Sequence, residues 1–150
     1  MSHFGLPTPF WFALYGLLVG AVLGLPLAAL CAPVLVSARL RALFALGPTS
    51  RWGGNYLLAV VGLSAVHGAV VSALSVTASD ALAVGNAALD FVVLFVVVLW
   101  LCAVVGLPRQ HYEWRGDSPV RAGGVLAVAL GWYAAVTTVP VVLLTAIASI

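Results

Sequence analysis

Long apolar runs separated by short polar segments are the main pattern of this sequence. The apolar runs cover about residues 9–36, 56–76, 81–107 and 123–147, with polar segments at 37–55, 77–80 and 108–122. A transmembrane helix needs roughly 20 consecutive, mostly apolar residues to cross the hydrocarbon core. Each run meets that length, and none shows the period-two alternation of a membrane barrel strand. The pattern therefore predicts four transmembrane helices.

The lengths of the runs and of their connections predict the arrangement of these helices. The segment 77–80 is too short for anything but a tight turn, and short connections join antiparallel neighbours. The first run is much longer than the core of a signal peptide and follows no basic residue, so we expect it to be retained. The expected fold class is an all-α membrane protein, an antiparallel up-down bundle of four transmembrane helices forming a single domain over residues 1–150.

The basic residues predict the orientation of this bundle. They all lie in the two longer connections, which hold Arg39, Arg41, Arg51, Arg109, Arg115 and Arg121. In a chain of four spans both connections lie on one side, and cytoplasmic loops are the ones enriched in Lys and Arg. The N-terminal tail, the 77–80 turn and the C-terminus carry no Lys or Arg. We therefore expect both termini to be extracytoplasmic.

The composition supports a membrane location and disfavours other classes. Apolar residues make up 64% of the chain and charged residues only 7%, whereas soluble domains are about one quarter charged. The lipid bilayer is thus the expected solvent. All basic residues are Arg, which together with the Ala, Val, Leu and Gly bias favours a prokaryotic genome and a prokaryotic plasma membrane. No basic stripe with interleaved aromatic residues indicates a nucleic-acid partner.

Small residues spaced four apart predict where helices approach closely. Lipid tails are as apolar as leucine, so helices in a membrane associate largely through close backbone contact. Small-xxx-small seams occur in the first run (Gly16, Gly20, Gly24), the second (Ser64, Gly68, Ser72) and the fourth (Gly123, Ala127, Gly131). The Val-rich third run has none. The seams fit either packing within the bundle or association with a second copy or another membrane protein.

Two ionisable residues within the spans are the main candidates for chemistry. His67 and Asp90 each lie about eleven positions from the centre of the 77–80 turn, or roughly 17 Å along a helix. They should therefore lie at one depth near the bilayer midplane. Asn86 lies one turn from Asp90, and Thr137 and Thr138 fall near the same level. The sequence thus predicts a polar layer inside an apolar bundle.

The sequence leaves the role of this polar layer open. An ionised Asp at the centre of a membrane helix costs about 2.5–3.5 kcal/mol on insertion-based scales. Protonation, pairing with His67 or contact with water would each remove that cost. A polar clasp that fixes the register of two helices, a site that handles protons or ions, and no contact at all are the three alternatives.

Motifs for enzyme chemistry are lacking. Cys31 and Cys102 match no metal-binding spacing, and His111 has no second His at ligand distance. No nucleophile–base pairing, phosphate-binding loop or dinucleotide fingerprint occurs. Haem ligation across a bundle usually needs two facing histidines, and only His67 lies within a span. We expect no cofactor and no metal, and the sequence favours a protein that is not an enzyme.

These observations favour one function and leave one alternative. The seams and the minimal loops are typical of a structural or accessory subunit that packs against itself or against a larger membrane complex. The alternative is an oligomeric component of a proton, ion or small-solute transporter that uses a midplane pair of His67 and Asp90, since transporter sites tend to lie at that depth.

Overall fold

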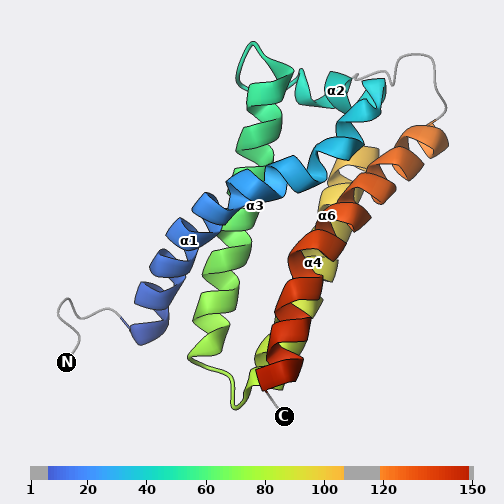
Figure 1. Cartoon of the computed structure of the whole chain (residues 1–150). Helices are drawn as coiled ribbons and strands as arrows, with labels where there is room; N and C mark the ends of the chain where they lie inside the picture. The colour runs from blue at the N-terminus through green and yellow to red at the C-terminus, as the bar shows by residue number, and fades with distance from the viewer. Residues whose placement is uncertain (1–6, 107–118, 149–150) are drawn as a thin grey trace.

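The computed structural model describes residues 7–106 and 119–148, and its regular secondary structure there is entirely helical (Figure 1). The helices are α1 (Thr8–Cys31), α2 (Ala38–Phe44), α3 (Trp52–Ser75), α4 (Ala81–Leu101) and α6 (Pro119–Ala148). A 3-10 turn, η1 (Ala32–Val36), follows α1, and a π-helical turn, η2 (Cys102–Gly106), follows α4. The described residues contain no strand, which confirms the all-α class.

Four helical segments in the described residues are long and apolar enough to cross a membrane. They are Thr8–Val36, Trp52–Ser75, Leu82–Gly106 and Gly123–Ala148. The prediction of four helices that are long and apolar enough to cross a membrane is therefore confirmed, and the second of them begins at Trp52 rather than near residue 56. The protein is a multi-pass membrane protein. The up-down order and the side on which the termini lie stay predictions.

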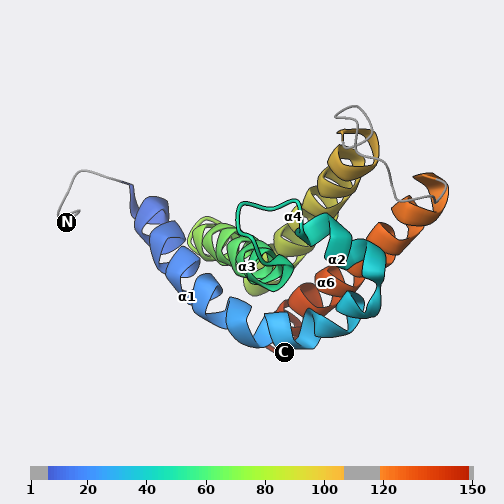
Figure 2. The same cartoon turned by 90° about the horizontal axis from the view of Figure 1, so that it is seen from above.

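The bundle consists of two closely packed helix pairs. The most extensive contacts join α1 to α3 and α4 to α6, whereas α3 with α4 and α1 with α6 touch far less. Figure 2 shows α3 lying inside the curve of α1, with α4 and α6 beyond it. Because close packing is concentrated within each pair, space remains between the pairs.

Glycines bring α1 and α3 together. Gly16, Gly20 and Gly24 are buried on the side of α1 that faces α3. A Cβ on Gly20 would overlap the carbonyl oxygen of Ser64, and one on Gly68 would overlap the carbonyl oxygen of Gly16. Only residues without a side chain permit such an approach of two backbones, which maximises dispersion contacts between the helices.

The second pair is also held by small residues, although sequence analysis found no seam on α4. A Cβ on Gly85 would overlap Oγ1 of Thr145 on α6. One turn further along α4, Ala88 is fully buried and Val92 is 2% exposed. Toward the other end, the indole N–H of Trp100 donates to the carbonyl oxygen of Gly123 at 2.9 Å. The contact residues Gly85 and Ala88 are three positions apart, so they do not form the four-residue spacing that marks the other seams.

The end of α1 shows how one proline links two helices. Pro33 has no N–H to bond the carbonyl oxygen of Ala29, so the N–H of Ala32 bonds it instead and the helix tightens. The carbonyl oxygen of Ala28 then accepts a hydrogen bond from the hydroxyl of Tyr56 on α3, at 2.5 Å. Because the N–H of Ala32 bonds Ala29 and not Ala28, the carbonyl oxygen of Ala28 is available for this buried hydrogen bond between α1 and α3.

The turn between α3 and α4 ends in a charged cap. The carboxylate of Asp80 accepts a hydrogen bond from the N–H of Ala83 at 2.7 Å and one from the hydroxyl of Ser79. The hydrogen bond from Ala83 makes the largest contribution to lowering the pKa of Asp80, and the bond from Ser79 makes the next largest. At pH values above the ordinary pKa of an aspartate, the ionised Asp80 therefore stabilises the start of α4. This stabilisation is lost as the pH falls through the lowered pKa of Asp80.

A substitution separates this titration from those of other groups. In Asp80→Asn the side-chain oxygen still caps the helix but no longer titrates. We expect wild type to lose thermal stability relative to Asp80→Asn when the pH falls from about 6 to about 3, as the carboxylate protonates. Thermal melts in detergent, followed by circular dichroism, measure the difference. Melting temperatures that decline in parallel would contradict this account.

Candidate functional site

The predicted polar layer is divided between the inside and the outside of the bundle. His67 on α3 and Thr137 and Thr138 on α6 are buried, with exposed fractions of 8%, 8% and 4%. Asn86 and Asp90 on α4 are exposed. The residues expected in one layer therefore lie in two chemical environments.

The structure does not bring His67 and Asp90 together. Each lies eight residues from the end of its span nearest the turn (75 − 67 and 90 − 82), so their depths agree. The side chain that meets His67 is Phe91, whose ring centroid lies 6.4 Å from that of the imidazole. In the described residues no hydrogen bond or ion pair joins His67 to Asp90. Of the three alternatives for the polar layer, the arrangement of the described residues agrees with the one in which His67 and Asp90 do not touch.

The rotation of α4 about its own axis explains the difference. Successive residues in an α-helix point about 100° apart, so a helix that turns Phe91 toward α3 turns Asp90 away. In this rotation Gly85 approaches Thr145 of α6, and Ala88 and Val92, on the same side of α4, are buried. The opposite side of this helix is exposed and carries four residues: Asn86, Asp90, Val93 and Val97. We call this surface the Asp90 face.

A cavity of about 480 Å³ lies between α1, α3 and α6, and we call it the His67 cavity. Its polar lining comes from Ser64, His67, Ser72 and Thr137, and the rest is mainly apolar. The hydroxyl of Thr137 donates within its own helix, to the carbonyl oxygen of Tyr133 at 2.8 Å. The imidazole of His67 has no hydrogen bond from any residue in the described part of the chain. The cavity is therefore mainly apolar, and the imidazole of His67 is the one ionisable group in its lining.

Three buried hydroxyls also lack hydrogen-bond partners among the described residues: Ser64, Tyr133 and Thr138. Ser64 and Tyr133 are close enough to interact electrostatically across α3 and α6, but not in hydrogen-bond geometry. Thr138 lines a separate groove between α4 and α6. Tyr133 was not among the candidate site residues predicted from the sequence. A lone Tyr within an apolar span, one turn from Thr137, was the available signal.

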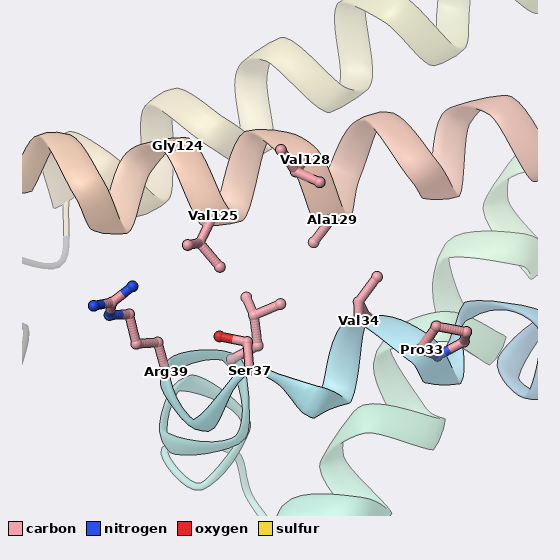
Figure 3. A pocket seen from close by; sticks show the side chains of 9 residues that line it. Pro33, Val34, Ser37, Arg39, Gly124, Val125, Val128 and Ala129 are labelled. Atoms are coloured by element: carbon pink, nitrogen blue, oxygen red, sulfur yellow. The ribbon is translucent and has the colours of Figure 1, made fainter.

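A second cavity, of about 530 Å³, lies at the arginine-bearing end of the first span. Figure 3 shows the side chain of Arg39 directed from α2 toward the first half of α6, opposite Val125. Arg41 donates to the carbonyl oxygen of Leu35 at 2.7 Å and so caps η1, whereas Arg51 precedes α3 and is exposed. Arg121 belongs to the first turn of α6. Arg109 and Arg115 lie outside the described residues.

The small residues of the fourth span have unequal environments. Gly123 is buried beside Trp100 of α4 and Val104 of η2. Ala127 and Gly131 are exposed, and a Cβ on Gly131 would meet nothing within 4 Å. Only the first residue of this seam therefore serves packing within the described chain. The two cysteines lie apart, Cys31 buried in α1 and Cys102 exposed in η2.

Comparison with known proteins adds a family but no activity. No curated protein and no solved structure matches the chain. A family model described as a domain of unknown function (DUF8162) matches residues 10–150, which include all four membrane-capable segments apart from the first two residues of α1. Because that match covers nearly the whole chain, the protein belongs to the DUF8162 family.

Proposed function

We propose that this protein is an accessory subunit of a larger membrane complex and that it docks through the Asp90 face of α4. The observation that carries the proposal is the exposure of Asp90 within a membrane span. Asp90 lies eight residues from the start of its span, or roughly 12 Å along the helix axis, and Asn86 lies one turn closer to that start. Both polar groups would otherwise face lipid tails.

The energetic cost of this exposure supports a partner. An Asp within the hydrocarbon core costs about 2.5–3.5 kcal/mol even on the lenient insertion-based scales, and an unpaired amide adds to that. No described residue of the chain bonds to the Asp90 carboxyl. A helix that supplies hydrogen-bond donors at this depth would remove the cost. The same contact would fix the partner's depth and rotation.

Charge complementarity identifies the kind of partner. None of the four membrane-capable segments contains Lys or Arg. A second copy would therefore bring another Asp90 to the same depth, and two carboxylates repel each other unless one is protonated. A helix of a different membrane protein, carrying Lys or Arg within its span, complements Asp90 best. The setting we propose is a prokaryotic plasma membrane, with the arginine-bearing loops in the cytoplasm and both termini outside.

Co-purification in a mild detergent tests the proposal. Wild type is expected to come out with a stoichiometric partner, and Asp90→Leu is expected to lose that partner while melting at least as high as wild type. Leu94→Ala is the matched control, because Leu94 is exposed on the same helix and carries no polar group. It should retain the partner.

The chemistry of the partner decides the outcome. Mass spectrometry should identify a membrane protein with a basic residue inside a span, and replacing that residue by Leu should break the complex. An exchange of charges, with Asp90→Lys and the partner's basic residue changed to Asp, should restore it. Wild type that is solubilised alone or as a homo-oligomer, or Asp90→Leu that keeps its partner, would refute the proposal.

The alternative of proton or ion transport through a pair of His67 and Asp90 has weaker support. A relay needs donor and acceptor within hydrogen-bond reach or joined by water. Phe91 occupies the position opposite His67, and Asp90 faces outward. We therefore place the two residues in different roles.

A further inference from the structure

We propose that the His67 cavity binds a molecule dissolved in the bilayer, with an apolar body and a carbonyl group that accepts a hydrogen bond from His67. The proposal concerns α1, α3 and α6 and does not depend on docking at the Asp90 face. Its ligand class is defined by a mostly apolar pocket whose polar lining consists of the imidazole of His67 and three hydroxyls, those of Ser64, Ser72 and Thr137.

The dimensions and lining of the cavity fit such a ligand. Small-molecule sites are mostly apolar, occupy about 300–1,000 Å³ and use a few polar groups to fix orientation. The His67 cavity has about 480 Å³ and walls that include Val19, Leu23, Leu27, Val141 and Leu144. These walls suit an alkyl, isoprenoid or acyl body. They offer no charged side chain for an ionic ligand.

The state of His67 supports a hydrogen-bonding ligand. A neutral imidazole carries one N–H donor and one acceptor nitrogen. His67 is 8% exposed, contacts the ring of Phe91 and has no hydrogen-bond partner among the described residues. A buried donor without a partner costs about 1–3 kcal/mol, and proteins seldom leave one unsatisfied. A ligand carbonyl in the cavity would accept this hydrogen bond.

The route into the cavity leads from the lipid. α1 and α6 form opposite walls and touch each other little. On these walls Leu23 is 54% exposed and Leu144 is 67% exposed, so the cavity communicates with the outer surface of the spans. Pro26 and Pro140 also lie in the walls.

Equilibrium binding to the purified protein tests the inference. Two carbonyl probes, decylubiquinone and dioctanoylglycerol, separate a quinone source from an acyl-ester source, and decylbenzene is the carbonyl-free control. We expect saturable binding of at least one carbonyl probe. His67→Phe should weaken that binding by about five- to tenfold, the net value of one hydrogen bond. It should leave decylbenzene unaffected.

A second pair of variants keeps the test decisive. Val141→Trp fills the cavity and should abolish binding of all three probes, whereas Val98→Trp on the exposed side of α4 should change nothing. Intact circular dichroism verifies that each variant folds. Equal binding of the carbonyl probes to wild type and His67→Phe, unchanged binding to Val141→Trp, or no saturable binding to wild type would each overturn the inference. None of these results bears on the partner of Asp90.

Discussion

Replacing Gly20 by valine is expected to force α1 away from α3 and to lower the free energy of unfolding by about 3 kcal/mol, at the upper end for overpacked sites. The added side chain would overlap the backbone carbonyl oxygen of Ser64 and crowd the Cα of Ala65. Backbone atoms cannot turn aside as a flexible side chain can. The helices must separate, and the dispersion contacts along their whole interface weaken.

Gly62→Val is the matched control for this substitution. Gly62 also lies within a membrane span, but a Cβ there would meet nothing within 4 Å. The free energy of unfolding of Gly62→Val should stay within about 0.5 kcal/mol of the wild-type value, as is usual for substitutions at exposed sites. Equilibrium unfolding in mixed micelles, followed by circular dichroism, measures both variants. A Gly20→Val protein as stable as Gly62→Val would show that the close approach of α1 and α3 does not stabilise the fold.

Replacing Asn55 by leucine is expected to release the connection between α2 and α3 and to lower the free energy of unfolding by about 2–3 kcal/mol, near 1 kcal/mol for each hydrogen bond. Its oxygen accepts from the N–H of Thr49 at 2.8 Å. Its amide group donates to the carbonyl oxygens of Phe44 and Thr49 at 2.7 and 3.0 Å. Leucine has a similar size but would leave the N–H and the carbonyl oxygen of Thr49 without these bonds, whereas the carbonyl oxygen of Phe44 would keep the bond from the N–H of Gly47 at 3.2 Å.

Asn55→Asp isolates the two donated bonds. Aspartate retains an acceptor for the N–H of Thr49 but turns an oxygen toward two carbonyl oxygens, so we expect a loss at least as large as in Asn55→Leu. Ser50→Ala, at an exposed position of the same loop, is the control. The same unfolding measurement applies, together with hydrogen exchange at the amide of Thr49. Wild-type stability in Asn55→Asp would mean that the donated bonds contribute nothing.

Asn55 illustrates what sequence patterns miss. It lies at the boundary between a polar loop and an apolar run, where a buried side chain of 5% exposure was not expected. Its partners are backbone groups six and eleven positions away. Sequence patterns for helices extend over three or four positions, so such contacts leave no periodic trace. A polar residue immediately after Gly53 and Gly54 was the available signal.

The sequence by itself determined the number, length and type of the spans and the depth of His67 and Asp90. Apolar length, helical rise and the position of a turn are properties of one chain segment, and lipid leaves a helix as the main way to satisfy its backbone. The glycines of α1 and the small residues of α3 could likewise be identified, because a four-residue spacing marks one side of a helix.

Only the tertiary structure decided which side of each helix faces inward. In water, an apolar stripe would fix the rotation, but in lipid both sides of α4 are apolar enough and burial does not distinguish them. The rotation instead brings Gly85 against Thr145 of α6 and buries Ala88, and it directs Phe91 to His67 and Asp90 outward. A rotation of α4 by about 100°, the angle between successive residues, therefore decides whether Asp90 pairs with His67 inside the bundle or lies on the exposed surface proposed for docking.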